Sequence, residues 1–151
     1  SWSYEGGIAT PLIARWPKTI KPGTTTDQVG HIIDFMPTFL EIANSKYPAE
    51  YKGNEILPVE GRSLLPILQG QQRQGHDWLF WEWSGSRAVR NGDWKLVGGK
   101  GADGWELYDL SEDRTETKNL AADHPERVKQ MAQSWLDWAE LTGLKNSKSK
   151  K

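Results

Sequence analysis

The sequence contains no cysteine, and only three of its 151 residues are histidines. The lack of cysteine excludes disulfides, thiolate metal ligands and a cysteine nucleophile within these residues. His31, His76 and His124 are too scattered along the sequence to suggest a histidine-rich metal site. An excess of one charge is missing too, since 19 Lys and Arg stand against 20 Asp and Glu. The basic stripe of a nucleic-acid-binding protein is therefore absent.

Long hydrophobic runs are also lacking. No apolar stretch approaches the roughly 20 residues of a membrane-spanning helix, so we expect a soluble chain without a membrane span. Targeting cannot be read from residue 1 onward, because neither an initiator Met nor a signal-type segment is present. At the other end, four lysines fall within residues 145–151. We expect residues 144–151 to form a disordered basic tail, because such a composition buries little apolar area.

Nine tryptophans and 15 glycines indicate an aromatic-rich globular body with many loops. In the first half, the apolar run Leu12–Trp16 ends at a proline and predicts a buried strand. Asp34 to Ala43 predicts a helix with Asp34 as N-cap and with two adjoining apolar stripes, which imply that it is well buried. Residues 44–62 read as a long irregular connection, and Ser63 to Gln69 as a short helix.

The second half changes to the period of strands. Four strands are predicted, over residues 78–83, 87–90, 93–97 and 105–110. Asn91-Gly92 predicts a tight hairpin turn with positive φ at both positions. Asp123 and Glu126 predict a capping box at the start of an amphipathic helix over residues 124–142.

These elements predict an α+β protein in two parts. Residues 76–143 would form a four-stranded antiparallel sheet with one face covered by the C-terminal helix. Residues 1–75 would supply one strand, one helix and an irregular link. One strand and one helix cannot make a core alone, so we expect this part to be the end of a larger α/β sheet.

Most of the tryptophans are predicted to be core residues. Trp94, Trp105, Trp135 and Trp138 lie at apolar positions of strands and helix. Trp83 is the tryptophan that we consider as a ligand contact, because alternation separates Trp81 and Trp83 from Trp78.

Charged side chains accompany Trp83 on the same predicted hairpin. Glu82, near Arg87 and Arg90, could act as an acid or take part in anion binding. Cross-strand ion pairs at the surface are the commoner role for such residues.

Other polar clusters are weaker candidates. The segment Asp109–Asp113 lacks the glycine and spacing of a calcium loop, so a capped turn is favoured. His31 near Asp34 could be a carboxylate-oriented base, but no nucleophile at meaningful spacing completes the arrangement. The residues alone contain no complete catalytic constellation and do not lead to a reaction.

A series of collinear motifs over residues 4–143 resembles the type I sulfatases. The matching segments are Tyr4-Glu5-Gly6-Gly7-Ile8 with Pro11-Leu12-Ile13-x-Arg15-Trp16-Pro17, Asp34-x-x-Pro37-Thr38-Phe39-Leu40-Glu41-Ile42-Ala43, Gly61-Arg62-Ser63-Leu64-Leu65-Pro66, Ala88-Val89-Arg90-x-Gly92-x-Trp94-Lys95-Leu96, Glu106-Leu107-Tyr108-Asp109-Leu110, and Asn119-Leu120-Ala121 before Pro125-Glu126. Each motif is weak alone, but together they are specific.

The resemblance implies the end of an alkaline-phosphatase-like α/β domain, followed by a four-stranded sheet with a helix packed on it. It implies hydrolysis of sulfate esters of a small molecule or glycan by an arylsulfatase-like, periplasmic or secreted enzyme. Formylglycine and calcium would act in the full-length protein, together with the N-terminal part of its own chain. No catalytic residue and no metal ligand are expected here, and the chain alone should be inactive.

The resemblance also implies that this chain closes the main sheet of the enzyme. It would line one wall of the substrate cleft with Glu82, Trp83 and Arg87. Two positions depart from the family pattern. Ala9 stands where many members have arginine, and Trp83 stands where related sequences often have histidine. The family's active-site lysine would fall immediately before Ser1.

Two alternatives remain open from the sequence. A related phosphatase or phosphonate hydrolase shares the superfamily fold, although the motifs at residues 106–110 and 119–121 favour a sulfatase. A stand-alone carbohydrate-binding module would explain the tryptophans. It would not explain the unfinished strand–helix piece at residues 8–43.

Overall fold

The computed structural model describes residues 2–99 and 104–144. The chain forms two compact units, and each is described by itself. The first unit combines residues 1–11 with residues 77–151, and the second comprises residues 12–76. Residues 1–11 therefore group with the sheet, whereas the sequence placed them with residues 12–75. Of the predicted tail at 144–151, residues 145–151 lie outside the described residues, whereas Leu144 packs against the core beside α4.

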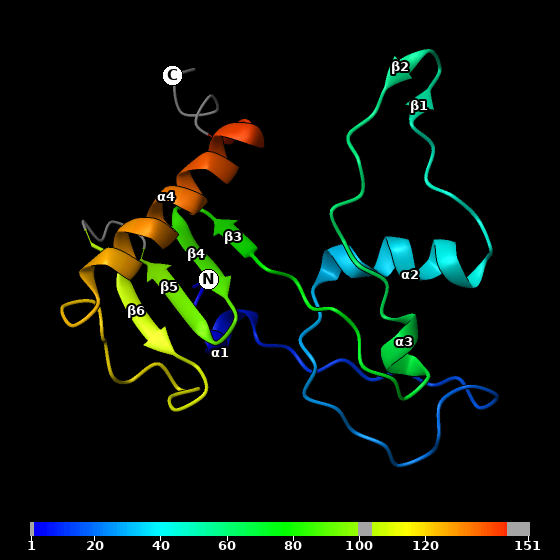
Figure 1. The fold of residues 1–151 in the computed structure, drawn as a ribbon, viewed down its shortest axis with the longest axis horizontal. Coiled ribbons are helices and arrows are strands. Elements are labelled where there is room, and N and C mark those ends of the chain that lie inside the picture. Colours follow the sequence, from blue (N-terminus) through cyan, green and yellow to red (C-terminus); the bar gives the residue numbers. More distant parts are fainter. Residues whose placement is uncertain (1, 100–103, 145–151) are drawn as a thin grey trace. The chain divides into compact units, whose positions relative to one another are not determined.

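A four-stranded antiparallel sheet forms the centre of the first unit. Its strands are β3 (Leu79–Trp83), β4 (Ser86–Asn91), β5 (Trp94–Gly98) and β6 (Glu106–Asp109), in the order β3-β4-β5-β6. Helix α4 (Pro125–Leu141) lies across one face (Figure 1). The predicted sheet with a covering helix is confirmed, with element ends within two residues of the predicted ones.

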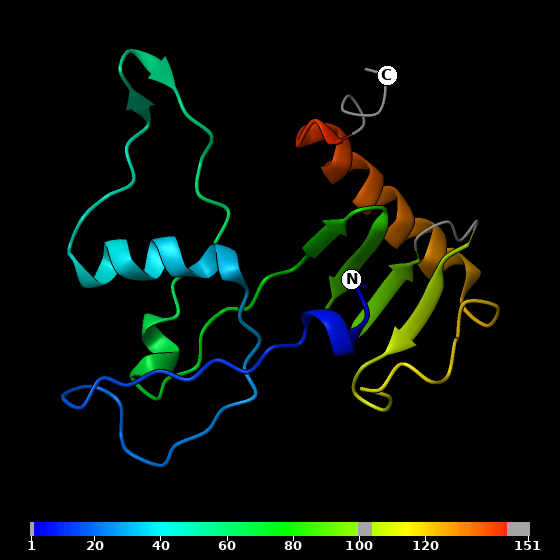
Figure 2. The same ribbon diagram turned by 180° about the vertical axis from the view of Figure 1, so that it is seen from behind.

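The core of this unit lies on both faces of the sheet. Between sheet and α4, the buried cluster consists of Val89, Leu96, Leu107, Met131, Trp135 and Ala139. Trp94, Trp105 and Trp138 pack against this cluster, so these tryptophans belong to the core as predicted. On the opposite face, Tyr4 and Trp81 cover a second cluster of Ala88, Val97, Tyr108 and Leu110. The short helix α1 (Glu5–Ile8) follows Tyr4 and is seen against the sheet in Figure 2.

The β4–β5 hairpin differs from its predicted turn, and the β3–β4 hairpin has the backbone conformation that was predicted for the β4–β5 turn. Asn91 pairs with Trp94, so the turn residues between β4 and β5 are Gly92 and Asp93 rather than Asn91 and Gly92. Among these, only Gly92 has a positive φ, of 60°. Between β3 and β4, Ser84 and Gly85 both have positive φ, of 52° and 91°. The turn that needs positive φ at both central positions is therefore the Ser84-Gly85 turn.

The start of α4 also differs from its prediction. The N-cap residue is His124, whose side chain makes no capping hydrogen bond. The predicted Asp123–Glu126 capping box is wrong, because Pro125 fixes the first helical position and shifts the cap by one residue.

The second unit contains a 3₁₀ turn, η1 (Ile32–Asp34), that continues into α2 (Phe35–Ile42). His31 is the N-cap of this helical stretch. The side chain of Asp34 accepts a hydrogen bond from the backbone N–H of His31. Asp34 is thus not the side-chain cap that the sequence predicted. The unit also holds α3 (Leu65–Leu68) and a two-residue ladder of β1 (Glu50–Tyr51) and β2 (Asn54–Glu55), inside the predicted irregular connection.

Two predictions about burial in this unit are wrong. Leu12–Trp16 is not a strand, because no strand among the described residues pairs with it, and Ile13 is 91% exposed. Helix α2 is not well buried: Phe35, Met36, Phe39 and Ile42 are exposed and only Thr38 is buried. The apolar stripes are present, but no described element of the unit covers them. No helix within residues 2–99 and 104–144 has the length and apolar character to span a membrane.

Candidate functional site

The three predicted substrate contacts lie on the β3–β4 hairpin but on two faces of the sheet. Glu82 and Arg87 are cross-strand partners and therefore share a face, the one that carries α4. Trp83 comes next along β3, so its side chain belongs to the opposite face. The structure thus brings Glu82 and Arg87 together and separates Trp83 from them.

The side chain of Arg87 lies against tryptophan rings. Its guanidinium carbon is 4.3 Å from the ring centroid of Trp105 and 5.7 Å from that of Trp135. Both distances are within the range of cation–π attraction. Gly98, the cross-strand neighbour of Arg87 on β5, leaves room for this path, since an added Cβ would overlap with Nε of Arg87. This Nε is buried and has no hydrogen-bond partner.

The carboxylate of Glu82 has a different partner from the expected one. Its Oε1 accepts a hydrogen bond of 2.9 Å from the backbone N–H of Gly85. Glu82 therefore fastens the Ser84-Gly85 turn. The surface ion pair that we expected between Glu82 and Arg87 is not formed between these described residues.

Trp83 is exposed to 64% at the end of β3. Its cross-strand partner is Ser86, whose hydroxyl accepts a 2.8 Å hydrogen bond from the backbone N–H of Ser3. Trp2, next to Ser3, is exposed to 55%. Two accessible indole rings therefore flank the buried contact between Ser3 and Ser86.

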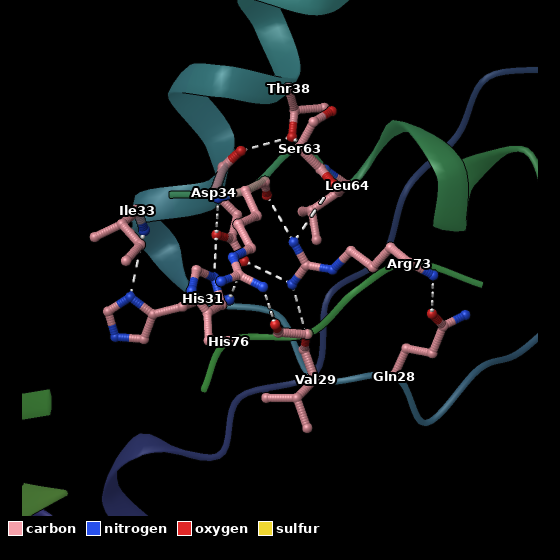
Figure 3. Close-up of polar contacts among 12 residues, drawn as sticks. Gln28, Val29, His31, Ile33, Asp34, Thr38, Ser63, Leu64, Arg73 and His76 are labelled. Atoms are coloured by element: carbon pink, nitrogen blue, oxygen red, sulfur yellow. Dashed lines mark hydrogen bonds and ion pairs between the residues drawn. The ribbon is translucent and has the colours of Figure 1, made fainter. Parts of the chain in front are cut away.

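A second candidate cluster, in the other unit, is centred on Asp34 (Figure 3). This carboxylate is completely buried. Its Oδ2 lies 2.9 Å from Nη2 of Arg73, and its Oδ1 lies 2.6 Å from Nε2 of His76. Backbone N–H groups of His31 and Arg62 donate to the same carboxylate, at 2.8 and 2.9 Å. The cluster ties the start of α2 to residues 62–76.

Burial alone would raise the pKa of Asp34, but the four hydrogen bonds outweigh it. The pKa is therefore held below its usual value of 3.8, and Asp34 is ionised at neutral pH. Burial lowers the pKa of His31, and neighbouring His76 lowers it further, against the opposing charge of Asp34. Nδ1 of His31 accepts from the backbone N–H of Ile33. The imidazole hydrogen-bonded to the Asp34 carboxylate is that of His76, whereas His31 donates to this carboxylate through its backbone N–H.

A third cluster surrounds Lys95, which is fully buried on the face opposite α4. Its Nζ lies 2.8 Å from Glu5 and 2.8 Å from Glu116. Nearby, the hydroxyls of Tyr4 and Tyr108 both donate to Oε2 of Glu106, at 2.5 and 2.6 Å. These contacts fasten the segment around α1 to strands β5 and β6.

No group of three or more His, Cys, Asp or Glu within residues 2–99 and 104–144 could hold a metal ion. The side chains at 109 and 113 instead close turns, as predicted. Asp109 accepts from the N–H of Ser111, and Asp113 accepts from the N–H groups of Thr117 and Lys118. The described residues therefore do not fit the calcium ion that the family resemblance implies.

Sequence reasoning missed Arg73, His76 and Lys95 as members of buried charge clusters. Arg73 was passed over in a polar stretch without a motif, and Lys95 stood inside a strand motif. The one available signal was alternation in β5, which puts Lys95 on the same face as Val97 and hence between buried neighbours.

The chain matches the family described as "N-sulphoglucosamine sulphohydrolase, C-terminal" over residues 1–140. It is 34% identical to an uncharacterized sulfatase of Schizosaccharomyces pombe, over 93% of this chain and 26% of that protein. It is 30% identical to an N-acetylglucosamine-6-O-sulfatase of Bacteroides thetaiotaomicron, over 86% of this chain and 25% of that protein. The chain thus spans about a quarter of the length of these relatives.

Solved structures give the same result for the fold. One is a protein in complex with its substrate D-glucosamine-2-N,6-O-disulfate, with a TM-score of 0.61 and 24% identity over 91% of this chain and 29% of that one. This likeness confirms the expected fold, the end of an alkaline-phosphatase-like α/β domain with its C-terminal sheet and helix. Because the family match covers nearly the whole chain, the protein belongs to the family "N-sulphoglucosamine sulphohydrolase, C-terminal", and the relatives named above are sulfatases.

Proposed function

We propose that this chain acts as the C-terminal part of a sulfatase that hydrolyses sulfate esters. The observation that carries the proposal is the family match over residues 1–140 to a domain described as C-terminal. The exposed apolar face of α2 supports it, because an α/β sheet supplied by the rest of such a protein would cover this face. The activity itself, with its formylglycine and calcium, would belong to the part of the protein outside these residues.

We propose sulfated sugars as the substrate class. The support comes from relatives that act on or bind sulfated glucosamine derivatives by their descriptions. In this reading the β3–β4 hairpin forms one wall of the substrate cleft. Trp83 offers an accessible ring to a sugar face, while Glu82 and Arg87 lie on the other side of the hairpin. A periplasmic or secreted location is part of the same proposal, and fractionation of the cells that make the protein would test it.

The test compares this chain with the longer protein encoded by its gene. Both are incubated with an aryl sulfate, glucosamine 6-sulfate and the matching phosphate esters, with and without added calcium. We expect release of sulfate by the longer protein only. Turnover by the 151-residue chain alone, or hydrolysis of only the phosphate esters by the longer protein, would contradict the proposal.

The wall of the cleft is tested by Trp83→Ala in the longer protein. We expect a higher KM for sulfated sugars with little change in stability, because Trp83 is exposed. Tyr51→Ala is the matched control, since this aromatic side chain is also exposed, to 62%, but lies on β1 in the other unit. An unchanged KM in the Trp83 variant would remove Trp83 from the wall.

A further inference from the structure

Asn91 is the only asparagine in the sequence that is followed by glycine. The backbone nitrogen of the next residue stands at the right number of bonds from an asparagine side-chain amide to close a succinimide ring with it. Gly92 has no side chain to hinder this approach. It is exposed in the turn between β4 and β5, with a φ of 60°. The local sequence therefore permits attack of the Gly92 nitrogen on the amide carbon of Asn91.

In the folded chain, the amide of Asn91 is held away from Gly92. Its Nδ2 donates a 2.8 Å hydrogen bond to the backbone carbonyl of Asp77, just before β3, the strand beside β4. The backbone of Asn91 is also fixed, because Asn91 pairs with Trp94 at the end of the β4–β5 ladder. The side chain thus extends toward a neighbouring segment, whereas ring closure requires it to turn back onto its own backbone. The hydrogen bond to Asp77 must open before the reaction starts.

The opening that is required is local. Asn91 is the last residue of β4, and its hydrogen bond to Asp77 is exposed. A single exposed hydrogen bond between neutral groups contributes little net stability, and the ends of strands open without unfolding of the sheet. The turn itself stays in place, since the carbonyl of Gly92 accepts a 2.7 Å hydrogen bond from Nε of Arg90.

We propose that Asn91 is a site of spontaneous deamidation and that its hydrogen bond to Asp77 sets the rate. In the first step, the Gly92 nitrogen bonds to Cγ of Asn91, and the side-chain nitrogen leaves as ammonia with the proton of the Gly92 N–H. In the second step, water opens the succinimide at one of its two carbonyl carbons. The products are aspartate and isoaspartate, and water is the only co-reactant. This inference is independent of the proposed function, because the reaction needs no substrate.

Neither product restores the contact with Asp77. An ionised carboxylate accepts hydrogen bonds but donates none, so it cannot replace the Asn91 amide opposite a carbonyl oxygen. The new negative charge also lies two residues from Asp93. Isoaspartate lengthens the backbone within the hairpin and moves the carbonyl of Asp93 away from its 2.8 Å hydrogen bond with the N–H of Leu110. Modified chains should therefore lose the turn end of the β4–β5 ladder.

The rate is measured on the 151-residue chain at mildly alkaline pH, in buffer and in urea. Peptides of each sample are analysed by mass spectrometry over time. We expect deamidation of Asn91 in both samples, about tenfold or more slower in the folded chain because opening must come first. Asn44, Asn54 and Asn119, which are followed by Ser, Glu and Leu, are internal controls and should react much more slowly than Asn91 in urea.

Three variants separate the chemistry from the opening. Gly92→Ala adds a side chain at the attacking residue and should slow the reaction in urea, where the fold plays no part. Leu79→Ala removes a buried side chain two residues after Asp77 and should speed the reaction of the folded chain several-fold by loosening the start of β3. Met131→Ala is the matched control, since Met131 is equally buried in the same unit but lies on α4. It should leave the rate at Asn91 unchanged under conditions in which the variant stays folded.

An Asn91 that stays unmodified in urea would overturn the inference. Equal rates in the folded and the urea-unfolded chain would also overturn it, because the hydrogen bond to Asp77 would then have no influence. Equal acceleration by Leu79→Ala and Met131→Ala would assign the rate to unfolding of the whole unit and would contradict control by local opening.

Discussion

The carboxylate of Asp34 holds the imidazole of His76, with Oδ1 and Nε2 only 2.6 Å apart. These residues are 42 positions apart in sequence, and both side chains are almost inaccessible to solvent. Arg73 shares the same carboxylate. One buried carboxylate therefore accepts hydrogen bonds from two basic side chains and from two backbone N–H groups.

Asp34→Asn is expected to destabilise the second unit by about 3–5 kcal/mol, because it leaves a buried arginine without its counter-ion. Hydrogen exchange of the amides of Arg62 and Leu64 gives the measurement, since these N–H groups donate to Asp34 and Thr38. Both amides should exchange faster in the variant. Asp27→Asn, at an exposed position of the same unit, is the control and should leave them unchanged.

The lowered pKa of Asp34 predicts that the free energy of unfolding depends on pH in the acid range. Since the pKa of Asp34 is lower in the folded chain than its usual 3.8, ionisation of Asp34 stabilises the fold at pH values above 3.8. This stabilisation is lost as pH falls through the folded pKa. NMR titration of the Asp34 carboxyl carbon measures the pKa directly, and a midpoint at or above 3.8 would contradict the prediction. Asp34→Asn should lack this component of the acid unfolding.

Lys95→Met is expected to cost about 3–5 kcal/mol of unfolding free energy, because it leaves Glu5 and Glu116 as buried charges without a cation. Urea unfolding followed by tryptophan fluorescence provides the measurement. Removal of all three charges, in Lys95→Met with Glu5→Gln and Glu116→Gln, should recover much of the loss. Lys129→Met, at an exposed position of α4, is the control. A triple variant as unstable as the single one would show that the ion pairs are not the cause.

The two tyrosines that donate to Glu106 should ionise late in an alkaline titration. Burial, then the hydrogen bond to Glu106 and its negative charge, raise the pKa of Tyr4 to about 12 and shift the pKa of Tyr108 upward as well. Their contribution to stability is present below pH 10 and is lost as pH rises through the folded values. The ultraviolet absorbance of the phenolate measures the ionisation of these tyrosines.

Glu106→Gln removes the charge that faces both hydroxyls, so both tyrosines should then ionise at lower pH. Glu112→Gln, at an exposed position, is the control that should leave the titration unchanged. If Glu106→Gln left the alkaline titration as it was, the assigned electrostatic cause would be wrong.

The adjacent glycines of α1 should respond differently to the same substitution. A Cβ on Gly7 would overlap with the backbone carbonyl of Trp2, whereas a Cβ on Gly6 meets nothing within 4 Å. We expect Gly7→Ala to cost about 1–3 kcal/mol and to speed exchange of the Ser3 amide, which donates to Ser86. Gly6→Ala should be tolerated. Equal effects of the two substitutions would refute the packing explanation.

The sequence predicted those parts of the fold in which local pattern and tertiary environment agree. Strands β3–β6 and helix α4 bury their apolar side chains within one unit, so alternation and helical periodicity were sufficient guides. For α2 the same reasoning was only half right. Periodicity identified the helix, but Phe39 is exposed because no described element of the second unit covers it.

The charge clusters could not be predicted in the same way. Asp34 meets His76, and Lys95 meets Glu5, only after the chain has brought distant segments together. Periodicity carries no information about such partners. Composition was equally uninformative about Arg87, whose place on Trp105 depends on the absence of a side chain at Gly98. Glu82, Trp83 and Arg87 stay predicted substrate contacts, and their distribution over two faces of the sheet could be seen only in the structure.

The discontinuity of the first unit has a consequence for the order of folding. Ser3 contacts Ser86, Tyr4 contacts Glu106 and Glu5 contacts Glu116, with 83 to 111 residues between the partners. Closing loops of this length costs entropy that the early contacts do not offset. During synthesis, the segment around α1 is made before β6 and the turn after it, so it cannot dock until these have also been made. Docking of this segment should therefore be a late, slow event, and a nascent chain stalled before residue 116 would expose it to proteases and chaperones.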